Sequence, residues 1–134
     1  MNKIIKFRGL DSLGNWVFGI PQTSTTLHLT LDCIAQYFTE QRKYGRQNVT
    51  VNPETVGQFT GLTDKNGIEI YYGDILKTVT GKLMVVDWSE NFASFVLNRS
   101  GWAFSHWFGE SCNPEDCEVV GNKYQNPDLL QDVV

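Results

Sequence analysis

The chain has 134 residues, a length that fits one domain or two small lobes. Hydrophobic residues make up 41% of the chain and charged residues 19%, which excludes wholesale disorder and is typical of a globular protein. The formal net charge of −4 disfavours a protein that coats duplex DNA, because such proteins need an excess of lysine and arginine to displace counterions.

The three cysteines, Cys33, Cys112 and Cys117, are an odd and sparse set that does not make a disulfide framework. We interpret them as free thiols in a reducing compartment. The sequence also lacks a secretory signal and an apolar run of the ~20 residues that a membrane span needs. We therefore expect a soluble cytoplasmic protein that does not bind a membrane.

The first part of the chain predicts a hairpin over about residues 1–20. Ile4 to Arg8 alternates apolar and charged residues, Asp11 to Asn15 is rich in turn formers, and Trp16 to Phe18 resumes the strand. Leu27 and Leu29 then alternate with polar residues, as in a further strand. Residues 32–41 fit a helical face and a strand equally well.

The rest of the chain predicts short strands separated by turns. The clearest turn is Asp64-Lys65-Asn66-Gly67, because Asn and Gly both accept a positive φ at low cost. Near the C-terminus, Asn126 and Pro127 are typical of a capped helical turn. The expected later strands are Ile68–Ile70, Ile75–Val79, Leu83–Trp88, Phe92–Leu97 and Glu118–Val120. This spacing favours an all-β fold built of antiparallel meanders, as a barrel or a sandwich.

One run is distinctive. It extends from Pro53 to Gly67 and continues in Glu69-Ile70-Tyr71 and Gly73-Asp74-Ile75. It closely resembles the signature of the YopX family of bacteriophage and prophage proteins, and both ends of the chain agree with it. The resemblance implies a single domain over 1–134, a phage or prophage origin and no known reaction. The central motif covers about 49–76, and a barrel-like part covers about 73–120.

Three positions depart from the family pattern: Leu10, Lys123 and Gln125. Lys123 stands where an apolar residue is usual, so we expect it to face solvent. The barrel-like part is also similar to small barrels of the Src-homology-3 type, which bind peptides, nucleic acids or nothing. The residues that we take as the signature of the fold are Gly57, Gly61, Asn66, Gly67, Gly73, Asp74, Gly121 and Asn122. We interpret them as turns and hinges between strands.

Catalytic and metal sites find little support. Four residues separate Cys112 from Cys117 and no second cysteine pair exists, so neither these residues nor His106 predict a metal site. No phosphate-binding loop or dinucleotide fingerprint occurs, so we predict no cofactor. Acid–base chemistry needs two carboxylates that converge in a cleft, which one sequence cannot show. The candidates for such a small hydrolase are Glu54, Asp64, Glu69, Asp74 and Asp87. We assign no catalytic residue.

An interaction surface is better supported. Trp102, Phe104 and Phe108 share one face of a predicted strand, with Trp107 on the other. If these aromatic residues are exposed, they could contact a protein or stack on bases. If they are buried, they belong to the core. The leading hypothesis is a non-enzymatic protein–protein interaction module that also self-associates. The alternatives are a nucleic-acid-associated small barrel, with Lys6 and Arg8 as contacts, and a small hydrolase of unknown substrate.

Overall fold

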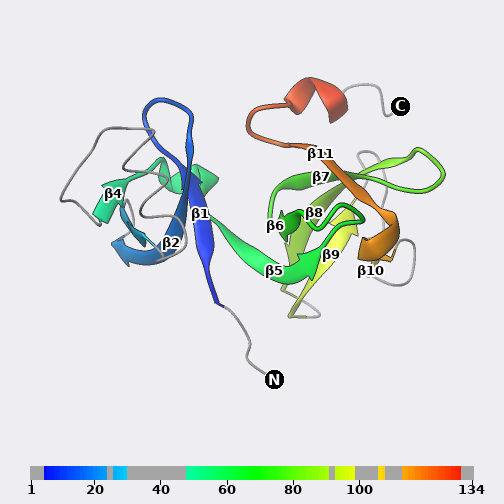
Figure 1. Cartoon of the computed structure of the whole chain (residues 1–134), viewed down its shortest axis with the longest axis horizontal. Coiled ribbons are helices and arrows are strands. Elements are labelled where there is room, and N and C mark those ends of the chain that lie inside the picture. The colour runs from blue at the N-terminus through cyan, green and yellow to red at the C-terminus, as the bar shows by residue number, and fades with distance from the viewer. Residues whose placement is uncertain are drawn as a thin grey trace. The chain divides into compact units, whose positions relative to one another are not determined.

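The structure is a computed structural model that describes residues 5–23, 26–29, 48–90, 93–98, 106–107 and 113–130 (Figure 1). At 23, 29, 48, 106 and 107 it describes the backbone alone. Within these ranges every strand pairing is antiparallel, and the helical structure consists of the 3-10 turns η1 (Pro53–Thr55), η2 (Pro114–Asp116) and η3 (Pro127–Leu130). The predicted all-β antiparallel fold is confirmed. None of the described helices is long and apolar enough to span a membrane.

The chain divides into two compact units, Met1–Phe59 and Thr60–Val134. The strands of the first unit are β1 (Phe7–Leu10), β2 (Trp16–Thr23), β3 (Thr26–Leu29), β4 (Asn48–Thr50) and the start of β5 (Gly57–Thr63), hydrogen-bonded in the order β4-β3-β2-β1-β5. A small core forms between them from Val17, Leu27, Val49 and Val51. The ambiguous segment 32–41 lies outside the described residues.

The second unit begins in β5, whose later residues pair with β6 (Glu69–Tyr71). Its main sheet contains β7 (Asp74–Lys77), β8 (Leu83–Ser89), β9 (Ser94–Asn98), β10 (His106–Trp107) and β11 (Glu118–Asn122), in the order β10-β9-β8-β7-β11. In Figure 1, β11 (orange) returns along β7 (green). No pairing joins β10 to β11 in the described residues, so this five-stranded sheet stays open there.

The core of the second unit explains why buried and partly exposed residues alternate along β8. Ile70, Leu76, Val86 and Leu97 are fully buried, and Met84 is nearly so. Met84 and Val86 point inward from β8, while the residues between and beside them are partly exposed, which is the period-2 pattern of a sheet with one buried face.

Cys117 completes this core, with none of its surface exposed, and it is disulfide-bonded. The expectation of free thiols is therefore wrong for this residue. The number of cysteines could not reveal this disulfide, because three cysteines are compatible both with three free thiols and with one disulfide and one free thiol. Cys33 and Cys112 lie outside the described residues.

Two glycines of the second unit share the same backbone strain but differ in steric contact. Gly73 and Gly81 both have a positive φ, at 91° and 86°. A Cβ on Gly73 would lie 2.9 Å from Cε2 of Tyr124, whereas a Cβ on Gly81 would meet nothing within 4 Å. The first position therefore carries a steric demand that the second lacks.

We predict that Gly81→Ala lowers the free energy of unfolding by about 1 kcal/mol, the cost of the left-handed conformation. Gly73→Ala should cost roughly 1–3 kcal/mol more, because the ring of Tyr124 must shift as well. Urea unfolding of both variants measures the difference. Equal costs would show that Tyr124 does not pack on Gly73.

Candidate functional site

Three hairpin turns in the described part of the chain share one hydrogen-bond pattern. They span residues 11–15, 64–68 and 78–82. In each, the first N–H donates to the fifth carbonyl and the fourth N–H donates back to the first, at 2.8–3.1 Å. The fourth residue is a glycine with φ between 76° and 86°. A side-chain oxygen of the first residue accepts at least one further backbone N–H. Asp or Thr at the first position and Gly at the fourth are what such a loop requires.

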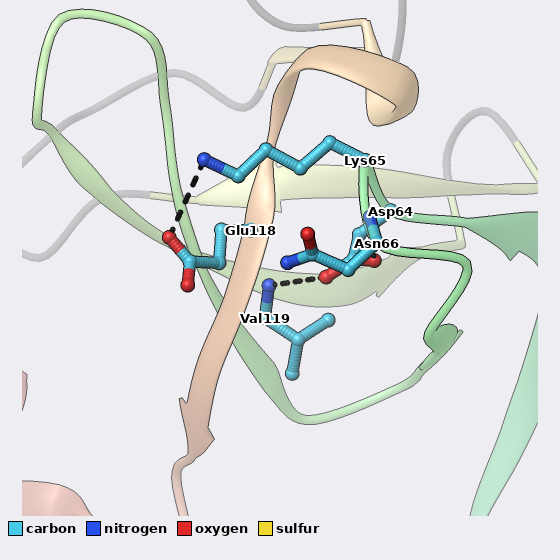
Figure 2. Close-up of polar contacts among 5 residues, drawn as sticks. All are labelled: Asp64, Lys65, Asn66, Glu118 and Val119. Atoms are coloured by element: carbon cyan, nitrogen blue, oxygen red, sulfur yellow. Dashed lines mark hydrogen bonds and ion pairs between the residues drawn. The ribbon is translucent and has the colours of Figure 1, made fainter.

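The Asp64 turn differs from the other two in a bond that reaches β11. Its Oδ1 accepts the N–H groups of Asn66 and Ile68, at 2.8 and 2.9 Å. Its Oδ2 accepts the N–H of Val119, 55 residues away, at 2.9 Å. Figure 2 shows the Asp64 carboxylate directed at the Val119 amide, beside Lys65 and Glu118. One side chain thus closes its own turn and attaches that turn to another strand.

Lys65 adds two contacts at the same place. Its backbone N–H donates to the carbonyl of Cys117 at 3.0 Å, and its ammonium lies 3.6 Å from Glu118 (Figure 2). Both side chains of that ion pair are about half exposed, so it contributes little stability. The two backbone contacts occupy the edge of β11 that does not pair with β7. The turn therefore protects an edge that could otherwise pair with another chain.

The electrostatics of Asp64 follow from its donors. Burial by itself raises the pKa of this carboxyl and is the largest single influence. The N–H bonds from Val119, Ile68 and Asn66, with the charge of Lys65, together outweigh it, so the pKa lies below its ordinary value. Asp64 is accordingly ionised at neutral pH, as a structural acceptor.

The other candidate carboxylates also serve the backbone or their neighbours. Asp74 is buried and accepts the N–H of Tyr71 at 2.8 Å. Glu69 accepts from the hydroxyl of Tyr71. The two oxygens of Asp87 accept from the Trp88 N–H and from the Asn98 side chain. Glu54 is exposed. In the described ranges, no group of three or more His, Cys, Asp or Glu side chains could hold a metal ion.

The residues of the predicted fold signature lie in turns, at close approaches and within strands. Gly61, Gly67 and Gly73 have a positive φ. The side chain of Asn122 accepts two backbone N–H groups of the turn that follows it, and a Cβ on Gly121 would lie 2.6 Å from Oδ1 of Asn126. Asn66 and Asp74 take part in the bonds described above. Gly57 is buried in β5.

A cluster around Lys123 was not foreseen. Its ammonium donates to the hydroxyl of Tyr72 at 2.9 Å and lies 4.4 and 5.3 Å from the ring centres of Tyr72 and Tyr124. Burial by itself lowers the pKa of Lys123, but the bond to Tyr72 and the nearby Tyr124 and Asp87 groups raise it above the ordinary value. Lys123 is thus half-buried between rings and does not simply face solvent.

The described aromatic surface centres on Trp88, whose side chain is 45% exposed. Its ring meets that of Phe95 edge to face, with centroids 5.0 Å apart. Sequence reasoning missed this residue, although it stands beside two acids, Asp87 and Glu90. The predicted interaction residues Trp102, Phe104 and Phe108, and the side chain of Trp107, lie outside the described residues.

Lys6 and Arg8, the predicted nucleic-acid contacts, are buried. They are 8% and 7% exposed. Lys6 lies over the ring of Phe59 at 5.3 Å, and Arg8 over the ring of Trp16 at 3.9 Å. Lys6 and Arg8 therefore do not form a solvated basic patch, and little of either side chain is left to contact a phosphate backbone.

Comparisons with known proteins agree with this fold. A family model described as YopX protein matches residues 6–131. Among solved structures, the chain is similar to the crystal structure of protein EF1440 from Enterococcus faecalis, with 21% sequence identity and a TM-score of 0.52. That match covers 97% of this chain and 100% of the other, and at this identity it shows the fold alone. No curated protein matches.

We predict that Asp64→Asn lowers the free energy of unfolding by about 2–3 kcal/mol at neutral pH, because it replaces charge-assisted bonds and turns an amide group toward an N–H donor. Thr78→Val, in the turn that lacks such a carboxylate, should cost at most about 1 kcal/mol. Chemical unfolding of both variants gives the comparison.

The effect of Asp64→Asn should also depend on pH. Because the folded pKa of Asp64 lies below the unfolded value of about 3.9, the stability that it supplies is complete above that value and is lost as the pH falls through the folded pKa. The difference in the free energy of unfolding between the wild type and Asp64→Asn should therefore become smaller below about pH 4. A difference in the free energy of unfolding that stays constant at strongly acidic pH would contradict the ionised state of Asp64.

Proposed function

This chain belongs to the YopX family, and we propose that it is a non-enzymatic binding protein whose second unit recognises a basic segment of another protein. The proposal rests on charge. Residues 60–134 contain eleven acidic and five basic side chains, a formal net charge of −6. Residues 1–59 contain four acidic and six basic side chains, a net charge of +2.

Four acidic residues of the second unit are exposed and therefore available to a partner. Glu90, Glu115, Asp116 and Asp128 are exposed. A surface of one sign steers a partner of the opposite sign and repels partners of its own sign. Such a surface favours a lysine- or arginine-rich protein segment over an acidic protein or a nucleic acid.

The carboxylates that could have served a hydrolase support binding over catalysis. A catalytic pair needs two carboxylates in one cleft with different environments. Asp64 and Asp74 instead accept backbone N–H groups at separate turns, and Asp87 is held by Trp88 and Asn98. These bonds explain the three residues as parts of the fold.

The burial of Lys6 and Arg8 and the negative second unit both weigh against the nucleic-acid alternative. A phage or prophage origin and a location in the bacterial cytoplasm belong to the proposal and rest on the family resemblance alone. Self-association stays a prediction from sequence, which light scattering on the purified chain measures.

We predict that the full chain binds a labelled arginine-rich peptide at low salt, and that affinity falls as salt is added, because the attraction is electrostatic. An acidic peptide of the same length and a single-stranded oligonucleotide should not bind. Fluorescence anisotropy measures all three. Failure to bind the arginine-rich peptide, or tighter binding of the oligonucleotide, would overturn the proposal.

A matched pair of variants tests which unit is responsible. Glu115→Lys reverses an exposed charge in the second unit, and Glu54→Lys makes the same change in the first. We expect weaker peptide binding for Glu115→Lys than for Glu54→Lys. Equal effects would show that the total charge matters and the second unit does not.

A further inference from the structure

Trp88 is held in a fixed place at the end of β8. It pairs across the strands with Phe95 of β9, and the two rings meet edge to face at 78°. Its backbone N–H donates to Oδ1 of Asp87 at 2.8 Å. Phe95 in turn packs on the buried core. Phe95 therefore supports the indole on one side, while Trp88 is 45% exposed.

The charged residues nearest to Trp88 in the sequence, Asp87 and Glu90, are both acidic. Glu90 follows two residues after Trp88, in the turn that comes directly after β8, and its side chain is exposed. Asp87 points to the opposite face, where it lies near the Lys123 ammonium. The lysine of that cluster is thus on the other side of the sheet from Trp88.

We propose that Trp88 and Glu90 form the contact for an arginine side chain of the partner. An indole is the best aromatic face for a cation, and the planar guanidinium can stack on it while donating to a carboxylate. The inference rests on the proposed function, which supplies a basic partner, and it adds the residues and the side chain that meet. A partner with neutral or acidic chemistry would find no complement to Glu90 here.

The test uses the full chain and an arginine-rich peptide, with a peptide in which citrulline replaces arginine as the uncharged control. In two-dimensional NMR spectra of the nitrogen-labelled protein, the indole N–H resonance of Trp88 should move with the arginine peptide and stay in place with the citrulline peptide. This readout needs no variant in the titration itself, because the spectrum of Trp88→Phe assigns the resonance.

Affinity measurements then test the residues. Trp88→Ala should weaken binding about two- to fivefold, the range of an exposed cation–π contact. Val79→Ala, which shortens another exposed apolar side chain of the same unit, should leave affinity unchanged. Glu90→Gln should weaken binding more than Glu115→Gln, which removes the same charge from another exposed position.

The outcomes separate the two proposals. If the wild-type chain binds the arginine peptide but Trp88→Ala binds it equally well and the indole resonance stays fixed, this inference is wrong and the proposed function stands. If the wild-type chain does not bind the arginine peptide at low salt, both fall. A moving indole resonance together with weaker binding of Trp88→Ala supports both.

Discussion

The carboxylate of Asp64 joins two parts of the second unit that lie 55 residues apart in the chain. With one oxygen it closes the turn at 64–68, and with the other it accepts the N–H of Val119 in β11. A buried carboxylate is costly unless its oxygens are paired, and here backbone donors pair both of them. The distinctive sequence run around this turn is therefore explained by architecture. It positions a hairpin on a strand edge, and no reaction is needed to account for its residues.

Other polar side chains also bond to the backbone. Asp11 and Thr78 begin turns of the same form as Asp64, Asp74 holds the Tyr71 amide, and Asn122 caps the turn before η3. Because these groups are committed to the backbone, we propose that the second unit functions through its surface. That surface is acidic and includes a half-exposed tryptophan supported by Phe95. Those are the features of a contact for a cationic partner.

The sequence predicted what depends on neighbours along the chain. The all-β fold, the turn at Asp64 and the helical turn after Asn126 follow from local chemistry. The turn differs from the prediction in one detail. Within residues 64–68 only Gly67 has a positive φ, and Asn66 donates its N–H to Oδ1 of Asp64. Contacts between residues that are distant in the sequence could not be predicted from local patterns. The burial of Lys6 and Arg8 over aromatic rings, the place of Lys123 between two tyrosines and the bond from Asp64 to Val119 all pair residues that the sequence separates. Trp88 was missed because its exposure depends on where β8 ends.

Amide hydrogen exchange at Val119 tests the central claim most directly. Its N–H lies on the edge of β11 that β7 does not cover, so its protection depends on the Asp64 carboxylate. We predict that this amide exchanges as slowly as the amides of the β7–β8 core, which open only when the second unit unfolds. Exchange at Val119 as fast as at an exposed strand edge would contradict the account, because the turn would then not hold β11.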